Sequence, residues 1–213
     1  IVDLRSGRAY QADTASASFG EQYLSSIEKI ILPNAVANAG SVVYTSTSGG
    51  VSIVGSKGND TFYVMGGSNT FSSNGGADWV SYANSGAGVD VRVDANGNGS
   101  SIFNGYGGKD ILYNISYLQG SSYNDYLAGN SILNGRNGND TLEGTGTLAI
   151  AYYREVSTGI IADLSTGIVS NDGYGCQYAL ININRIYGSD SGDVIYGNNN
   201  NNVINSYDGN DLI

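Results

Sequence analysis

Residues 55–81 read as three consecutive nonapeptides, GSKGNDTFY, VMGGSNTFS and SNGGADWVS. In each of them, glycine lies in the first half and an apolar residue in the second, so that Phe62, Phe71 and Val80 are spaced nine apart. A turn followed by a short strand, repeated at a fixed period, is typical of a chain that coils into stacked rungs. This stretch therefore predicts a parallel β-solenoid.

The same period returns at the C-terminus in the segments GSDSGDVIY, GNNNNNVIN and SYDGNDLI. These segments place Asp193, Asn202 and Asp211 nine residues apart. A weaker copy runs from residue 120 to residue 144, where Asp125 and Asp140 are fifteen residues apart instead of eighteen. We expect the coil between these two residues to be shortened or bulged.

A longer repeat contains the nonapeptides. Residues 77–97 match residues 147–167, the opening IVDLRSG matches the last part of that segment, and YLSSIEKI, ILYNISYL and ALININRI each precede a nonapeptide block. These matches predict three tandem modules, at residues 1–76, 77–146 and 147–213. Within the first module, residues 11–47 lack the pattern and are predicted to be irregular, with nonapeptide rungs from about residue 46.

Composition favours an extended, secreted, all-β protein with a narrow continuous core. The chain has 32 glycines and one proline among 213 residues, and its apolar residues, 40% of the total, are spread singly or in pairs. A net charge of −10 argues against a nucleic-acid partner, because phosphates require a basic surface. The apolar runs fall far short of the roughly 20 residues that span a bilayer, which argues against membrane insertion.

The turns carry the candidate chemistry, because backbone carbonyls and Asp carboxylates are the hard oxygen ligands that calcium prefers. If nine residues make half a coil, turns eighteen apart stack on the same edge, and stacked carboxylates then require a cation or a proton. The alternative is that Asp serves only as a turn former beside glycine. The candidate metal ligands are Asp60 with Asp78, Asp193 with Asp211, Asp190 with Asp208, and Asp125 with Asp140.

The four acids near the C-terminus, Asp190, Asp193, Asp208 and Asp211, are predicted to form the richest site. The intervening turns on the opposite edge carry Asn69 and Asn202 in place of Asp. That edge is predicted to have lost its charge and its ion, because Asn side chains can hydrogen-bond to their neighbours without metal.

The segments GSKGNDTF, GRNGNDTL, DGNDLI and SSYNDYLAGN resemble the hemolysin-type calcium-binding repeats of RTX proteins. The resemblance covers most of the chain, although only some turns retain the acid. It implies a parallel β-roll that binds Ca²⁺, is secreted unfolded from a bacterium by a type I system, and folds outside the cell or at its surface when calcium becomes available.

The sequence argues against catalysis. It contains no His and only four Glu, and no Ser or Cys stands beside a credible base, so no catalytic residue and no organic cofactor are predicted. Seventeen tyrosines and Trp79 suit aromatic ladders on a solenoid face, and they could alternatively stack on sugar rings.

The leading hypothesis is an extracellular structural or adhesive solenoid that binds calcium in its turns. It would self-assemble end to end into a fibre, surface layer or matrix, with extracellular polysaccharide as a further partner. The alternatives are the calcium-binding repeat domain of a larger secreted enzyme or toxin, and a glycan-binding module that uses surface tyrosines.

Overall fold

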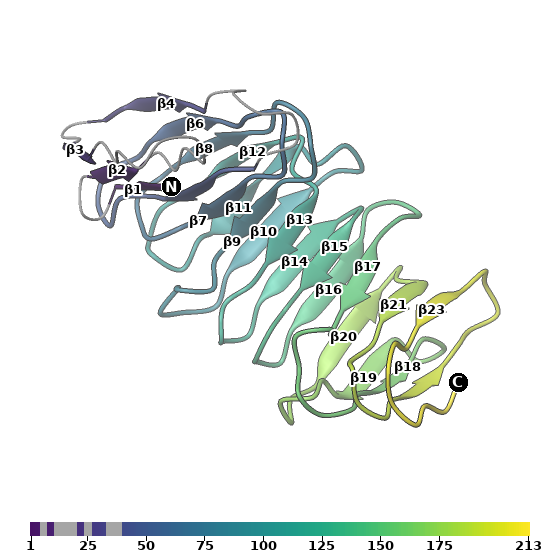
Figure 1. Ribbon diagram of the computed structural model, residues 1–213. Helices are drawn as coiled ribbons and strands as arrows, with labels where there is room; N and C mark the ends of the chain where they lie inside the picture. Colours follow the sequence, from purple (N-terminus) through teal and green to yellow (C-terminus); the bar gives the residue numbers. More distant parts are fainter. Residues whose placement is uncertain (5–7, 11–20, 24–26, 33–39) are drawn as a thin grey trace.

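The computed structural model describes residues 1–4, 8–10, 21–23, 27–32 and 40–213. These residues form short strands joined by turns, and none of them is helical. The strands belong to two sheets that run side by side along a rod (Figure 1). The all-β solenoid predicted from the nonapeptides is thereby confirmed.

Sheet A has eleven strands. In spatial order they are β23 (Val203–Asn205), β21 (Arg185–Tyr187), β17 (Ile150–Tyr152), β15 (Ile132–Asn134), β13 (Tyr117–Gln119), β9 (Trp79–Ser81), β7 (Thr61–Tyr63), β5 (Val42–Tyr44), β1 (Val2–Asp3), β2 (Arg8–Tyr10) and β3 (Glu21–Tyr23).

Sheet B has twelve strands. In spatial order they are β22 (Val194–Tyr196), β18 (Ile161–Asp163), β19 (Ile168–Asn171), β20 (Tyr178–Ile181), β16 (Thr141–Gly144), β14 (Tyr126–Gly129), β10 (Asp90–Val93), β11 (Gly99–Phe103), β12 (Ile111–Tyr113), β8 (Thr70–Ser72), β6 (Ser52–Val54) and β4 (Lys29–Ile31).

Nonapeptide strands alternate between the sheets, so a full coil takes eighteen residues. Thr61 of β7 accordingly pairs in parallel with Trp79 of β9. In the shortened coil, Tyr126 of β14 pairs in parallel with Thr141 of β16, and the register stays regular along both strands. The missing residues are absorbed by the two-residue connection between β14 and β15, which shortens the coil without a bulge.

The core lies between the sheets and is filled by the middle residue of most three-residue strands from β5 to β22. Phe62, Phe71 and Val80, which set the period in the sequence, are all fully buried. The rings of Phe62 and Phe71 stack across the core with centroids 5.3 Å apart. Alternation of buried and outward-facing residues along each strand explains why single apolar residues suffice to build this core.

Two antiparallel insertions interrupt the parallel coil, and the nonapeptide pattern did not predict them. Strand β11 pairs antiparallel with both β10 and β12, and strand β19 pairs antiparallel with both β18 and β20. Each insertion puts three strands into sheet B where a regular coil would put one. One insertion lies in the predicted second module and the other in the predicted third module.

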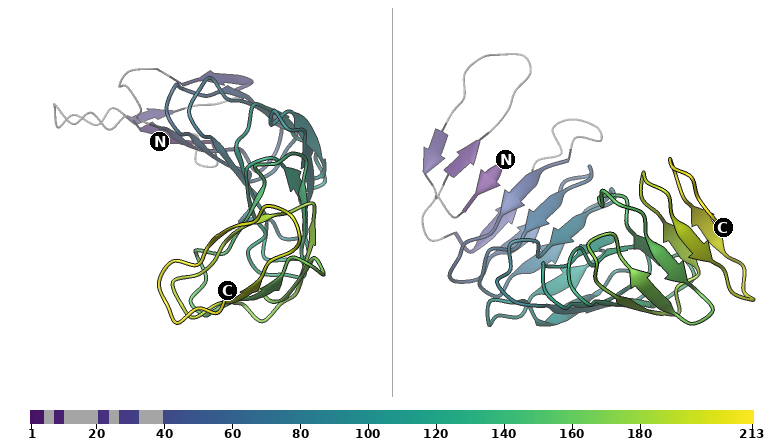
Figure 2. Two further views of the ribbon diagram at one scale, coloured as in Figure 1. Left: turned by 90° about the vertical axis from the view of Figure 1, so that its right-hand side faces the viewer. Right: turned by 90° about the horizontal axis from the view of Figure 1, so that it is seen from below.

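The insertions make sheet B longer than sheet A. From β6 to β22, sheet B contains eleven strands, whereas sheet A contains seven from β5 to β21. At about 4.8 Å per strand, the four additional strands lengthen that side of the rod by about 19 Å. The rod therefore bends with sheet A on its inner side, and Figure 2 shows the resulting arc.

Part of the segment predicted to be irregular, residues 11–20, 24–26 and 33–39, lies outside the described residues. The described part of residues 11–47 includes β3, β4 and β5, of which β4 and β5 join the parallel pairing of the two sheets. Within the described ranges, no helix is long and apolar enough to cross a membrane.

Candidate calcium sites

The predicted aspartates precede strands, and each pair is stacked on adjacent coils. Asp60 and Asp78 lie on the sheet A edge, because they directly precede β7 and β9. Asp125 and Asp140 precede β14 and β16 on the sheet B edge, where Asp193 and Asp211 also stack. The structure therefore brings together the partners of these three pairs.

One backbone contact links the members of every pair. The N–H of Asp60 donates to Oδ1 of Asp78 at 2.8 Å, and the N–H of Asp125 donates to Oδ1 of Asp140 at 2.8 Å. In the third pair, the N–H of Asp193 donates to Oδ1 of Asp211 at 2.9 Å. Each carboxylate thus serves as an acceptor for the preceding coil.

The first aspartate of each pair is held by a serine four residues earlier in its own turn. At Asp60, the Ser56 hydroxyl donates to Oδ1 at 2.9 Å and the Ser56 N–H donates to Oδ2 at 2.6 Å. Ser121 donates in the same way to Asp125, and Ser189 to Asp193. Sequence reasoning missed this serine, although the shared spacing GSxxxD in residues 55–60, 120–125 and 188–193 could have revealed it.

At the first pair, several oxygen atoms surround a space beside Gly55. A Cβ atom on Gly55 would lie 2.7 Å from Oδ2 of Asp60, 3.3 Å from Oδ2 of Asp78 and 3.4 Å from the carbonyl oxygen of Ser72. Oδ2 of Asp78 is buried and has no hydrogen-bond partner. Burial raises the pKa of Asp78, which shows that the charged carboxylate is poorly compensated. Two carboxylate oxygens and one carbonyl oxygen thus lie near the same side of Gly55, and these are the kind of ligand that calcium takes.

At the second pair, burial outweighs the hydrogen bonds. It raises the pKa of Asp125 to about 6, although Ser121 and the Val89 N–H both donate to the carboxylate. It raises the pKa of Asp140 to about 8, and the nearby charge of Asp125 adds to the shift. Oδ2 of Asp140 is also buried without a partner. These carboxylates therefore carry an uncompensated cost of ionisation.

The four acids near the C-terminus do not gather at one point. Asp190 lies on the surface and forms an ion pair of 3.2 Å with Arg154, while Asp208 is exposed. Both oxygens of Asp193 are occupied by Ser189, and Oδ1 also accepts from the Ile160 N–H. In the part of the chain that the structure describes, no three Asp, Glu, His or Cys side chains meet as a metal site.

The turn that carries Asn69 was predicted to lack a negative charge, but a carboxylate from another part of the chain lies next to it. Asn69 stacks on Asp110, whose Oδ1 accepts from the Asn69 backbone N–H at 2.8 Å and from its side-chain amide at 2.9 Å. Asp110 escaped prediction because the β10–β11 insertion places it 41 residues after Asn69, not eighteen. At Asn202 the expectation of a local amide network is met, since its side-chain amide donates to Oδ1 of Asn198 at 2.8 Å.

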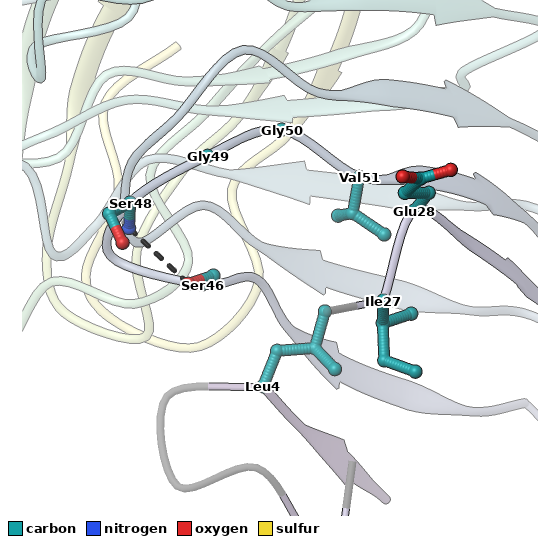
Figure 3. A pocket seen from close by; sticks show the side chains of 8 residues that line it. All are labelled: Leu4, Ile27, Glu28, Ser46, Ser48, Gly49, Gly50 and Val51. Atoms are coloured by element: carbon teal, nitrogen blue, oxygen red, sulfur yellow. Dashed lines mark hydrogen bonds between the residues drawn. The ribbon is translucent and has the colours of Figure 1, made fainter. Parts of the chain in front are cut away.

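A separate hollow of about 340 Å³ lies near the N-terminal end, beside Ser46–Val51 (Figure 3). The apolar side chains of Leu4, Ile27 and Val51 converge on it, whereas the Glu28 carboxylate points away from them. It offers no pair of carboxylates and differs in kind from the aspartate turns.

Comparison with known proteins agrees with this geometry. The family model of the RTX calcium-binding nonapeptide repeat matches residues 52–80 and 178–213, with four copies. The chain carries RTX repeats. The matched segments contain the pair Asp60 and Asp78 and the pair Asp193 and Asp211, whereas Asp125 and Asp140 lie outside them. No curated protein matches the chain.

The RTX repeats in these two segments imply a calcium-binding repeat domain, and such repeats typically occur in secreted bacterial proteins. The matched segments supply strands to the parallel pairing of both sheets, and the inserted hairpins lie between these segments or at their margin. The oxygens beside Gly55 lie inside the first matched segment, so the repeat pattern and the orphaned carboxylate oxygen indicate the same ion.

Proposed function

We propose that this chain is a calcium-stabilised, rod-like structural or adhesive segment of an extracellular bacterial protein, without catalytic activity of its own. The observation that carries the proposal is the arrangement at Gly55, where Oδ2 of Asp60 and the unpartnered Oδ2 of Asp78 share one space with the Ser72 carbonyl. Ca²⁺ bound by these oxygens would neutralise the buried Asp78 carboxylate, whose Oδ2 has no hydrogen-bond partner, beside the hydrogen-bonded carboxylate of Asp60.

Calcium at the pair Asp125 and Asp140, and at the pair Asp193 and Asp211 with its neighbours Asp190 and Asp208, belongs to the same proposal. A ligand that binds only the folded state stabilises it by RT ln(1 + [ligand]/Kd), about 2.7 kcal/mol at a concentration one hundred times Kd. Extracellular calcium modules bind with Kd values of about 0.1–1 mM. Calcium would therefore stabilise the folded rod outside the cell but not inside it.

A polysaccharide partner has less support than self-association. Tyr44 and Tyr63 stack on the outer face of sheet A with centroids 4.7 Å apart and planes at 11°, so the ring faces that would receive a sugar cover each other. Trp79 and Tyr117 are also in contact, with centroids 4.8 Å apart and planes tilted by 39°. These contacts favour the reading of the tyrosines as ladders that stiffen the rod.

Calorimetry and negative-stain electron microscopy test the proposal together. The melting temperature of the wild type should rise with millimolar Ca²⁺ and fall with chelator. An unchanged melting temperature would contradict the proposed calcium binding. Fibres or sheets that dissolve on chelation would support the structural role. Single rods under both conditions would instead favour the repeat domain of a larger secreted enzyme or toxin.

A further inference from the structure

The two inserted hairpins end in equivalent turns, NGYGGKD at residues 104–110 and DGYGCQY at residues 172–178. Gly105 and Gly173 have the same left-handed backbone, with φ of 79° and 88°. After each turn the chain joins sheet B, where Ile111 pairs with Thr70 and Ala179 pairs with Thr141. Asp172 thus occupies the position of Asn104, Tyr178 that of Asp110, and Asp140 that of Asn69.

In the first of these turns, one carboxylate is fully satisfied by two amides. Oδ1 of Asp110 accepts from the backbone N–H and the side-chain amide of Asn69, and Oδ2 accepts from the side-chain amide of Asn104 at 3.1 Å. Such an arrangement buries a single negative charge among donors, which a protein interior tolerates. It needs no ion.

The second turn exchanges these roles. Both amide donors are replaced by carboxylates, Asp140 and Asp172, and the central carboxylate is replaced by the Tyr178 hydroxyl. Oδ1 of Asp172 accepts from the Tyr174 and Cys176 N–H groups, whereas its Oδ2 has no partner. Oδ2 of Asp140 and the hydroxyl of Tyr153 also lack partners, and the three residues are at most 2% exposed.

These unpartnered atoms lie in one neighbourhood. The Tyr178 hydroxyl and Oδ2 of Asp140 both flank the point where a Cβ on Gly135 would stand, the hydroxyl at 2.7 Å. That hydroxyl also donates to the Arg136 carbonyl. The ring centroids of Tyr178 and Tyr153 are 5.4 Å apart, and burial, with a smaller effect of the Asp172 and Asp140 charges, raises the pKa of Tyr153.

We propose that the calcium ion at Asp140 is held jointly with Asp172, where the predicted second and third modules meet, with the hydroxyls of Tyr153 and Tyr178 as neutral oxygen neighbours. Two buried carboxylates and phenol oxygens form a hard, anionic oxygen set of the kind that suits Ca²⁺. This site differs from the pair beside Gly55, because one of its acids comes from the inserted hairpin and not from a nonapeptide turn. It deepens the proposed calcium function without depending on the site at Asp78.

Calcium stoichiometry of refolded variants tests this site. The full chain is refolded from urea, dialysed to equilibrium against buffer with Ca²⁺ above Kd, and its bound calcium is measured by atomic emission as the excess over the dialysate. The variant Asp172→Asn restores the side chain found at Asn104, and Asp140→Asn restores the one found at Asn69. Each should lose one calcium ion per chain relative to wild type, and the double variant should lose the same single ion. The control Asp163→Asn, at the end of β18, should lose none.

Several outcomes would overturn the shared site. If Asp140→Asn loses an ion and Asp172→Asn does not, the ion belongs to the pair Asp125 and Asp140 alone. Loss of two ions in the double variant would mean separate sites. If neither variant loses calcium, a buried water or a shared proton compensates the carboxylates. The variant Asp78→Asn should lose its own ion independently, so failure at Asp78 and failure at Asp172 are distinguishable.

Discussion

The backbone N–H of Asp60 donates a hydrogen bond of 2.8 Å to Oδ1 of Asp78, eighteen residues later in the chain. One oxygen of Asp78 therefore fastens adjacent coils, while the other is buried without a partner. The two oxygens have separable roles, because an amide can replace the first as an acceptor but cannot replace the charge of the second. This division underlies the first prediction.

Asp78→Asn should keep the coil contact and abolish the calcium response of this site. Because burial raises the pKa of Asp78, removal of its charge should leave the calcium-free protein as stable as wild type or more stable. The gain of about 2.7 kcal/mol expected at a calcium concentration one hundred times Kd should be lost. Calorimetry with Ca²⁺ and with chelator measures both effects. Asp94→Asn, at an exposed turn, is the matched control, and an undiminished calcium gain in Asp78→Asn would contradict the assignment.

Gly55→Ala should exclude the ion by steric means. The new Cβ would lie 2.7 Å from Oδ2 of Asp60 and would stand among the proposed ligands. Overpacking of this kind costs about 1–3 kcal/mol, and the calcium response should fall as well. Gly86→Ala serves as the control, since a Cβ there would meet no atom within 4 Å. Isothermal titration measures calcium binding by both variants. Equal binding by Gly55→Ala and Gly86→Ala would rule out an ion beside Gly55.

Ser121→Ala should destabilise the calcium-free protein. The Ser121 hydroxyl donates to Oδ1 of Asp125 at 2.7 Å, and a hydrogen bond to a charged group contributes about 1.5–3 kcal/mol. This hydrogen bond also lowers the pKa of Asp125, so its loss should shift that pKa above about 6. Urea unfolding and carboxyl NMR titration check the two effects. Ser100→Ala, on an exposed strand position, should change neither.

Without calcium, stability should fall as the pH rises from about 4 to 8. The folded pKa values of Asp125 and Asp140, about 6 and about 8, exceed the unfolded value near 3.9, so protons favour the folded state. The stabilisation is complete below about pH 4, and it is lost as the pH rises through 6 and then 8, by about 1.4 kcal/mol per unit for each group.

Urea unfolding in calcium-free buffers between pH 4.5 and 8.5 measures this slope. Saturating Ca²⁺ should flatten it, because the ion replaces the protons. Asp140→Asn should remove the part of the slope between about pH 6 and 8. A calcium-free protein that becomes more stable over this range would contradict the origin of the shifts.

The periodic part of the fold could be predicted from the sequence, because the glycines of each nonapeptide indicate its turn and the apolar residue indicates its buried strand position. Asp60 and Asp78 were paired correctly on that basis alone. The antiparallel strand β11 could not be found in this way, since its residues have no nonapeptide equivalent. Asp110 and Asp172 were missed for the same reason, because inserted hairpins break the spacing that relates a residue to the coil below it.

The outcome of Asp190 shows a second limit. Sequence spacing placed it with Asp208 as it placed Asp193 with Asp211, but spacing does not reveal which side of a turn a side chain takes. Asp193 is drawn into its turn by Ser189, whereas Asp190 faces outward to Arg154. A serine four residues before the aspartate, such as Ser189 before Asp193, is the sequence signal for a carboxylate that points into its turn. Asp190 has no such serine and points outward.

The inserted hairpins also determine which coil pairs with which. In a solenoid of similar rungs, a slip by one whole coil exchanges one set of apolar contacts for another and is opposed only weakly. The turn after β11 makes hydrogen bonds to one particular coil, from the Asn104 amide to the Gly67 carbonyl and from the Asn69 N–H to Asp110, and a slipped chain would lose them. The hairpins therefore mark fixed positions along a repetitive chain and favour a single alignment of its coils.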